Sequence, residues 1–467
     1  MYFLYNFLLI TILIATSPFW VYKVFTKEKH RKGFIEKTGI LPQHIKQAPS
    51  SGKRIHIHAV SVGEVNAVTP FIKELKKRHP DIRLILSTVT PTGYDVAHKR
   101  LPEVDHIIYF PFDLPWIVKR VINTIRPHIF ILVETELWPN FLRQIRRAGA
   151  VSIIINGRIS PHTLRGYTFI RPFMKRVLKN VDLFCMQSDE DARRIKSIGA
   201  PDNAIKITGN MKYDQKFIDV SGKDLMEKKG VFGIDKDDLV IIAGSTHKGE
   251  EEMILESYKK CHTPPPLNPL PQGEERLEGI PSIPPPLMGG GEGEGEQKVF
   301  SSEKIRLIIA PRHIERAGEI ERLVKMQGLE VVRRTELNSS KMNTIPYNTV
   351  MIVDTIGELA TLYSMADVVI IGGSFIPHGG QNPLEAIYYK RPVIFGQHMF
   401  NFQEITEEIL VNGAGVSVDN REDLARVLIE LLNDPDMRKK MGEKGYQIIQ
   451  KNRGTVEKNL VIVEKYL

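Results

Sequence analysis

The chain contains two successive series of short apolar runs, and stretches with helical periodicity separate the runs. The first series comprises Ile55–Val60, Leu84–Val89, Ile107–Phe110, Ile129–Val133, Ser152–Ile155, Leu183–Met186 and Ala204–Thr208. The second series comprises Leu239–Ala243, Ile305–Ala310, Glu330–Val332, Val350–Val353, Val368–Ile371, Val393–Phe395 and Gly415–Val418. Strands that alternate with helices form parallel sheets, so the pattern predicts an α/β fold with two doubly wound sheets.

The strand pattern pauses over Met211–Lys228, and this pause marks the expected domain boundary. We expect a first domain over residues 23–215 and a second over residues 216–467, with a cleft between them. A chain of 467 residues, of which 42% are hydrophobic, is large enough for two such domains. Because ligands bind at the carboxyl ends of the strands in such sheets, both domains can contribute to one site.

Residues 263–297 differ abruptly in composition from the rest of the second domain. They consist largely of proline triplets, a glycine triplet and Glu-Gly repeats. Such a segment buries too little apolar surface to order itself, so we expect a disordered surface insert whose deletion leaves the fold intact. A partner that binds polyproline is the alternative use of this insert.

The first 22 residues carry no charged side chain and are strongly apolar. About 20 such residues span a bilayer core, so residues 1–22 are expected to form a membrane anchor. The cations follow the apolar run instead of preceding it, which disfavours a cleaved signal peptide and places the following domains in the cytoplasm. They are Lys23, Lys27, Lys29, Arg31, Lys32 and Lys37. A helix that enters one leaflet without crossing is the remaining alternative.

The formal net charge of +9 favours an anionic partner. Nucleic acid is disfavoured because the chain shows neither an RNA-recognition motif nor zinc-finger spacing. A phospholipid surface and a phosphorylated substrate therefore remain. The only two cysteines, Cys185 and Cys261, are too few for a disulfide framework or a four-ligand zinc site, which indicates a reducing compartment.

The segment Gly372–Glu385 contains a glycine-rich turn between an apolar strand and a helix. Asn382 suits the N-cap, Pro383 suits the first helical position, and Glu385 completes a pattern that resembles a capping box. Free N–H groups and the helix dipole make such a turn a place where phosphates bind. An ordinary strand-to-helix turn is the structural alternative.

Acidic and basic residues also follow strands of the first domain. Glu64 stands three residues after Ser61, so it either closes a helix by the capping-box spacing or accepts a proton from a substrate. Glu134 and Glu136 follow the apolar strand Ile129–Val133, as helix caps or as part of a polar site. Lys212 lies near the expected domain boundary, where it either binds an anion or is merely solvated.

Three further turns of this kind follow strands of the second domain. They are Gly244–Glu250, Pro311–His313 and Asp354–Glu358. Arg312 offers a forked donor for a phosphate or a carboxylate, and Thr355 and Glu358 again have capping-box spacing. Each turn alone is compatible with a simple capped helix, but their repetition in one domain favours a binding site.

Taken together, these motifs resemble those of the Kdo transferases, bacterial enzymes that transfer 3-deoxy-D-manno-octulosonic acid (Kdo) from CMP-Kdo to lipid A precursors. The resemblance covers nearly the whole chain outside residues 263–297. It is carried by His58–Glu64, Thr90–Gly93, Glu134–Asn140, Gly209–Lys212, Pro311–His313 and Gly379–Glu385. It implies the GT-B fold, in which two Rossmann-like domains face a cleft.

The resemblance also implies a role for each matching residue. Glu64 would be the general base, and Glu134 and Lys212 would stabilise the transition state of an inverting, metal-independent transfer that uses no cofactor. Gln381 departs from the family motif, which usually carries histidine there, and a neutral amide replaces a group that can be cationic. The residues that would bind CMP are Pro311, Arg312, Ile356, Gly357, Glu358, Asn382, Pro383, Leu384 and Glu385.

The implied partners are CMP-Kdo, an anionic glycolipid acceptor of the lipid A precursor type (lipid IVA) and the bacterial inner membrane, with both domains in the cytoplasm. An anionic membrane lipid as acceptor would account for the anchor and the positive charge together. One rival is another GT-B enzyme with a UDP-sugar donor, either a lipid glycosyltransferase or an epimerase. A second rival is a non-catalytic nucleotide-binding membrane module that recruits partners through the insert.

Overall fold

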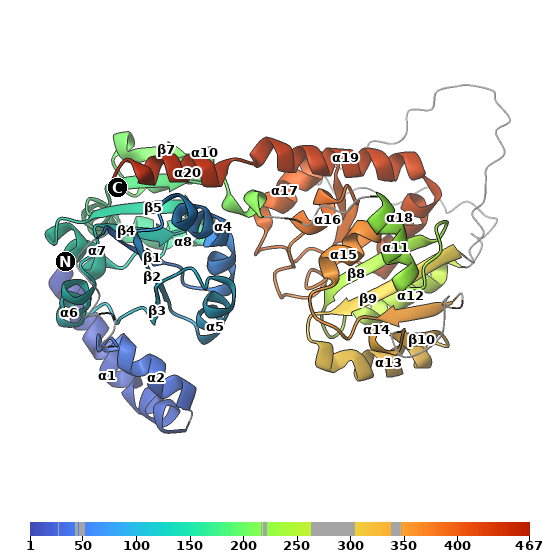
Figure 1. The fold of residues 1–467 in the computed structure, drawn as a ribbon, viewed down its shortest axis with the longest axis horizontal. Helices are drawn as coiled ribbons and strands as arrows, with labels where there is room; N and C mark the ends of the chain where they lie inside the picture. The colour runs from blue at the N-terminus through green and yellow to red at the C-terminus, as the bar shows by residue number, and fades with distance from the viewer. Residues whose placement is uncertain are drawn as a thin grey trace. The chain divides into compact units, whose positions relative to one another are not determined.

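The computed structural model describes residues 1–26, 28–42, 45, 52–215, 217, 222–262, 304–337, 346 and 348–467. The predicted insert, residues 263–297, lies outside the described residues. The chain forms two compact units: unit 1 contains residues 1–216 and 452–467, and unit 2 contains residues 217–451. Figure 1 shows the elements of each unit.

Unit 1 is built on a parallel seven-stranded sheet with the order β3-β2-β1-β4-β5-β6-β7. Its strands are β1 (Arg54–His58), β2 (Arg83–Thr88), β3 (His106–Tyr109), β4 (Ile129–Val133), β5 (Val151–Gly157), β6 (Leu183–Met186) and β7 (Ile205–Ile207). Its other elements are α1 (Tyr2–Thr26), α2 (Glu28–Lys37), α4 (Val62–Arg78), α5 (Pro91–Arg100), α6 (Pro115–Ile125), α7 (Pro139–Arg147), α8 (Pro161–Phe169), α9 (Arg171–Leu178), α10 (Asp189–Ser197), η1 (Asp202–Ala204), η2 (Met211–Asp214) and α20 (Thr455–Glu464).

Unit 2 contains a second parallel seven-stranded sheet with the order β10-β11-β9-β8-β12-β13-β14. Its strands are β8 (Leu239–Thr246), β9 (Ile305–Pro311), β10 (Glu330–Arg333), β11 (Thr349–Ile352), β12 (Val368–Ile371), β13 (Val393–Phe395) and β14 (Gly415–Ser417). Its helices are α11 (Gly222–Val231), α12 (Glu251–Cys261), η4 (Ile314–Arg316), α13 (Ala317–Met326), α14 (Arg334–Leu337), α15 (Leu359–Met365), α16 (Leu384–Tyr388), α17 (Gln403–Val411), α18 (Arg421–Asn433) and α19 (Pro435–Asn452). The predicted α/β fold with two parallel sheets is confirmed.

The central strands are apolar along their whole length because helices cover both faces of each sheet. All five residues of β4 are buried, and they alternate between two hydrophobic clusters on opposite faces: Phe130 and Leu132 join one cluster, whereas Ile131 joins the other. The register fixes where each strand ends, since Ile57 of β1 pairs with Leu86 of β2 and with Ile131 of β4. The carboxyl ends of these neighbouring strands therefore meet at one edge of the sheet.

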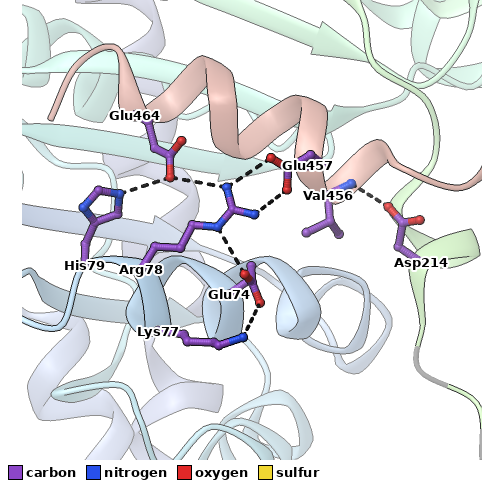
Figure 2. Close-up of polar contacts among 8 residues, drawn as sticks. All are labelled: Glu74, Lys77, Arg78, His79, Asp214, Val456, Glu457 and Glu464. Atoms are coloured by element: carbon purple, nitrogen blue, oxygen red, sulfur yellow. Dashed lines mark hydrogen bonds and ion pairs between the residues drawn. The ribbon is translucent and has the colours of Figure 1, made fainter.

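The last residues of the chain belong to unit 1 and not to the second domain, in which the sequence placed them. Helix α20 packs against α4 and η2, and Leu460 and Val463 are buried in the unit 1 core. The carboxylate of Asp214 accepts hydrogen bonds from the backbone N–H groups of Gly454 at 2.7 Å and Val456 at 2.5 Å, as Figure 2 shows for Val456. Apolar burial and this side-chain cap together hold the returning chain on unit 1.

A polar cluster at the surface joins α20 to the end of α4 (Figure 2). The guanidinium of Arg78 contacts both carboxylate oxygens of Glu457, at 3.1 and 2.5 Å, and also the carboxylate of Glu74 at 3.1 Å. Glu464 accepts from the ring of His79 at 3.1 Å. Because these groups are solvent-exposed, they contribute less to stability than the buried side chains beneath them.

Helix α1 is docked on unit 1 by polar contacts along one side. The hydroxyl of Tyr5 donates to Asp113 at 2.9 Å, and the side-chain amides of Asn6 and Asn140 meet at 2.6 Å. Asp113 also accepts from the backbone N–H groups of Asn140 and Phe141, at 2.9 and 2.8 Å. Among the described residues, no helix has the length and apolarity needed to cross a membrane, so the spanning anchor expected over residues 1–22 is not supported.

Replacing Asp214 with Ala is expected to lower the free energy of unfolding of unit 1 by about 1–2 kcal/mol, the usual cost of losing a helix N-terminal cap. Denaturant unfolding followed by circular dichroism measures this loss. Asp202→Ala is the control, since Asp202 forms only an exposed ion pair with Lys196. Equal stability of the two variants would contradict the capping role of Asp214.

Candidate functional site

Glu64 lies at the start of α4, directly after strand β1. Its carboxylate accepts from the backbone N–H of Val60 at 2.8 Å and from the hydroxyl of Ser61 at 3.1 Å. Ser61 is the N-cap of α4 and accepts in return from the backbone N–H of Glu64. The capping box that the sequence spacing indicated is therefore present, and it holds a carboxylate that is only 6% exposed.

The pKa of Glu64 is raised to about 8. Burial is the largest cause, and the negative charge of Glu134 is the next, while the hydrogen bond from Val60 acts in the opposite direction. Glu136 adds a smaller repulsion, and burial raises its own pKa as well. Three carboxylates thus meet at one edge of the unit 1 sheet, and Glu64 is suited to gain and lose a proton near neutral pH.

Glu134 is the residue directly after β4, and its backbone has the left-handed conformation with φ of 60°. A non-glycine residue adopts this conformation only where its surroundings impose it. Here its N–H donates to the carbonyl of Ile155 at 3.0 Å, and the next hydroxyl, that of Thr135, donates to the carbonyl of Arg158 at 2.5 Å. The two glutamates on this turn are therefore held by β5 and the residue that follows it.

A chain of hydrogen bonds among side chains that are largely buried supports the turn that carries Glu134 and Glu136. The indole N–H of Trp138 donates to Nε2 of His58 at 3.2 Å, so the proton of this ring is on Nδ1, 3.0 Å from the hydroxyl of Ser87. The same hydroxyl lies 2.8 Å from Nε2 of His56. Burial lowers the pKa of both histidines to about 3, so they are neutral, and Phe110 stacks on His58.

The hydrogen bonds of His56 and His58 were not predicted from the sequence. The available signal was the pair of histidines that alternate with isoleucines in strand Arg54–His58, because polar rings buried in a sheet need partners.

Lys212 lies on η2, which packs against α4. Its backbone N–H donates to the side-chain oxygen of Asn210 at 3.0 Å, and the neighbouring N–H of Met211 donates to Asn156 at 2.9 Å. The side chain of Lys212 is half-buried. Glu64 and Lys212 are therefore carried by two elements of unit 1 that are in contact.

In unit 2, a buried glutamate joins two of the predicted turns. Glu250 accepts from the backbone N–H groups of His247 and Gly373 at 2.8 Å each, and from that of Phe375 at 3.0 Å. Burial raises its pKa, and these three hydrogen bonds act against that rise. Glu250 thus fixes the loop after β8 against the glycine-rich loop after β12, which is a structural function.

Imidazole and guanidinium groups gather where these loops meet. The rings of His247 and His378 are stacked with centroids 4.4 Å apart, and Nε2 of His247 lies 3.4 Å from the amide nitrogen of Gln381. The pKa of His247 is lowered to about 4, mainly by burial and in addition by the nearby His378, His313, Arg312 and Arg316. This positive environment suits an anionic ligand. His378 was not predicted as a site residue, and only its place before the glycine pair could have indicated it.

The predicted nucleotide-binding residues follow β9, β11 and β12 of the unit 2 sheet, in which β9 and β11 are neighbours and β8 lies between β9 and β12. Pro311 ends β9, and Arg312 is exposed directly after it, with its N–H bonded to the carbonyl of Thr246 at 3.0 Å. Ile356 is 79% exposed, and Gly357 has φ of 96°, a conformation that suits glycine. All of these residues therefore lie toward the carboxyl edge of one sheet.

The start of α16 differs from the sequence prediction, and the structure also gives the contacts of Glu358 and the burial of Glu385. Helix α16 begins at Leu384, so Pro383 lies just before the helix and not at its first position, while the side chain of Asn382 accepts from the N–H of Leu384 at 3.1 Å. Glu358 forms an ion pair with Arg334 at 3.2 Å and accepts from the hydroxyl of Thr355. Glu385 is half-buried at the start of α16.

Comparisons with known proteins assign the chain to a family. Residues 29–215 match the model of 3-deoxy-D-manno-octulosonic-acid transferases, and residues 297–448 match that of group 1 glycosyl transferases. The 3-deoxy-D-manno-octulosonic acid transferase of Haemophilus influenzae is 31% identical, over 88% of this chain and 87% of the relative. That of Chlamydophila psittaci is 26% identical, over 100% of this chain and 96% of the relative.

Solved structures of other proteins share this fold. The UDP-GlcNAc 2-epimerase of Neisseria meningitidis matches with a TM-score of 0.52 at 13% identity, over 88% of this chain and 98% of that chain. The Anabaena protein HepE in complex with UDP matches with a TM-score of 0.51 at 12% identity, over 88% and 99%. Because the family model matches and a relative is 31% identical over most of both chains, this chain belongs to the 3-deoxy-D-manno-octulosonic acid (Kdo) transferase family and is a glycosyltransferase with the GT-B type of fold.

Proposed function

We propose that this protein transfers Kdo from CMP-Kdo to a lipid A precursor of the lipid IVA type, with inversion at the anomeric carbon and without a metal ion. The observation that carries this proposal is the buried carboxylate of Glu64, whose pKa is raised to about 8 beside Glu134. A carboxylate with such a pKa is a stronger base than an ordinary one. It suits the removal of a proton from a sugar hydroxyl as that oxygen attacks.

Glu134 and Lys212 of unit 1 would each stabilise one of the two charges that develop in this reaction. Positive charge develops on the sugar ring as the bond to the leaving group breaks, and the carboxylate of Glu134 would stabilise it. Negative charge passes to the departing CMP, and the ammonium group of Lys212 would stabilise that charge or the carboxylate of the donor sugar. The fixed left-handed backbone of Glu134 supports a preorganised position for this side chain.

Unit 2 would bind the nucleotide. The exposed guanidinium of Arg312 and the N–H groups at the start of α16 are suited to the phosphate, and the carboxylate of Glu385 is suited to the ribose hydroxyls. Pro311, Ile356 and Gly357 would provide backbone and apolar contacts. Glu358 would hold the turn through its ion pair with Arg334.

We further propose that the protein works at the cytoplasmic face of the bacterial inner membrane, with α1 lying in the plane of the interface. The side of α1 that bears Tyr5 and Asn6 contacts unit 1. Apolar side chains elsewhere on the helix are exposed to solvent, which is typical of helices that insert into one leaflet. They are Phe3, Leu4, Phe7, Leu8, Ile12 and Ile14.

Replacing Glu64 with Gln is expected to lower the rate of Kdo transfer by about 10²–10⁴-fold, the usual contribution of a general base. The assay mixes detergent-purified protein with lipid IVA and CMP-Kdo generated in situ and resolves the products by mass. Glu190→Gln is the control, because Glu190 is exposed and paired only with Arg194.

CMP should still protect the Glu64 variant against thermal unfolding, and it should do so better than UMP or UDP. Full activity of Glu64→Gln would remove Glu64 from the mechanism, and better protection by UDP would favour a UDP-sugar enzyme.

The pH dependence of kcat/KM is expected to report the raised pKa of Glu64. Only the deprotonated carboxylate accepts a proton, so kcat/KM should rise with pH and level off above pH of about 8. Glu134→Gln removes a nearby negative charge, which lowers the pKa of Glu64 and moves the rise to lower pH. Glu136→Gln should produce a smaller shift in the same direction. A profile whose midpoint is the same in all three proteins would contradict the assignment.

Membrane binding is expected to depend on the exposed side of α1. The double variant Phe3→Ser/Phe7→Ser should bind vesicles of phosphatidylglycerol and phosphatidylcholine at least about tenfold more weakly, because each large apolar side chain gains about 1.5–3 kcal/mol on burial. Cosedimentation with the vesicles measures the binding. Met326→Ser, at an 83% exposed position of unit 2, is the control and should bind like the parent protein. Equal binding by the double variant would exclude this side of α1 as the contact.

A further inference from the structure

Unit 2 contains a cavity of about 310 Å³ that the proposed transfer reaction does not use. It lies at the amino ends of β12 and β13, since Asp367 directly precedes β12 and Pro392 directly precedes β13. The carboxyl ends of the same sheet carry the candidate nucleotide site, so the cavity is at the opposite edge. The first turns of α19, which include Arg438 and Lys439, form another wall.

Arg391 is the most notable side chain of this cavity. Its Nη2 donates to the carbonyl of Ser364 at 2.6 Å, which fixes the guanidinium in place. Its Nε is buried and has no hydrogen-bond partner in the part of the chain that the structure describes. A buried N–H of a charged group without an acceptor is costly, so the guanidinium of Arg391 would be stabilised by an anion in the neighbouring cavity.

The charges around the cavity do not balance. Four cationic side chains line it, Lys390, Arg391, Arg438 and Lys439, against the two carboxylates of Asp367 and Glu443. Glu443 is already engaged by Lys390 at 2.9 Å.

Asp367 is the other carboxylate that lines the cavity, and Asp434 lies close enough to Arg438 to affect its charge. Oδ2 of Asp367 accepts from the backbone N–H of Val240 at 2.9 Å, and its Oδ1 lies 3.9 Å from Nε of Arg438. Arg438 is held in place because its Nη1 donates to the carbonyls of Leu431 and Leu432.

Burial lowers the pKa of both Arg391 and Arg438. The negative charge of Asp367 acts against this for both, Asp434 acts against it for Arg438, and the positive charge of Arg438 adds to it for Arg391. A guanidinium stays protonated despite such shifts. Positive charge is therefore in excess around the cavity, and an anion would compensate it.

We propose that this cavity is a second anion site of the protein, which binds a phosphate group as inorganic phosphate or as a phosphomonoester. The guanidinium groups of Arg391 and Arg438 and the ammonium group of Lys439 would supply the positive charge that holds the phosphate. Planar guanidinium groups match phosphate in geometry. The volume is near the lower end of the range for small-molecule sites, which suits a phosphate with a small organic substituent.

Isothermal titration of the full chain with inorganic phosphate, at constant ionic strength set by chloride, tests the proposal. Arg391→Met should weaken phosphate binding by about tenfold or more, equivalent to at least about 1.4 kcal/mol. Arg426→Met is the matched control, since it removes the same charge from an exposed position of unit 2 that pairs only with Asp423. Arg312→Met removes the phosphate contact proposed for the nucleotide site, so it should retain the component of phosphate binding that Arg391→Met loses. Binding that is lost in Arg312→Met and retained in Arg391→Met would overturn the proposal, as would an absence of phosphate binding to the parent protein.

A second variant guards against misfolding of Arg391→Met. Lys439 is exposed and forms no ion pair or hydrogen bond with the residues that the structure covers, so Lys439→Met should fold normally and still weaken phosphate binding several-fold. Unchanged binding in this variant and in Arg391→Met would refute the site. Glucose 6-phosphate in place of phosphate distinguishes the two sources: tighter binding of the sugar phosphate assigns a phosphomonoester, and weaker binding assigns the free ion.

Discussion

The contact between the buried carboxylate of Glu64 and the first turn of α4 is the interaction on which the proposed chemistry depends. The N–H of Val60 and the hydroxyl of Ser61 hold this carboxylate at the end of β1, and they also start the helix. Two hydrogen bonds do not fully compensate for the loss of water around a carboxylate with Glu134 nearby, so the proton is held more tightly than usual. One side chain is thereby both a helix cap and a base, and a substitution there tests both functions at once.

Glu250 in unit 2 differs from Glu64 in the number of backbone N–H groups that bond to its carboxylate. Three backbone N–H groups converge on its carboxylate, whereas a single backbone N–H and one hydroxyl meet Glu64. Burial raises the pKa of both carboxylates, but the three backbone donors oppose this rise at Glu250 and fix it as a joint between two loops, whereas Glu134 adds to the rise at Glu64. Both residues are buried glutamates near the end of a strand. The number of donors and the neighbouring charge, and not the residue type, separate a structural carboxylate from a reactive one.

Much of this organisation follows from local sequence patterns. The parallel strands, the capping box at Glu64 and the turns after the strands of unit 2 depend on residues close in sequence, and these predictions agree with the structure. The features that were missed depend on distant partners: Trp138 meets His58 across 80 positions, and Asp214 meets Gly454 across 240. The spacing of apolar residues along the chain carries no information about such contacts between distant positions. Helix α16 begins at Leu384, one residue later than expected, although the side chain of Asn382 still accepts from the N–H of Leu384. The roles of the predicted site residues stay predictions.

The return of α20 to unit 1 has a consequence for how the chain is made. A ribosome releases residues 1–216 first, then all of unit 2, and only afterwards the segment 452–467 that completes the first core. Until those last residues emerge, the surface against which Leu460 and Val463 pack is open, and Asp214 has no amide to accept from. Unit 2 can therefore fold during synthesis before the segment that completes the unit 1 core is available. Loss of residues 452–467 would expose part of the core of unit 1, which is otherwise formed by residues from the first half of the chain.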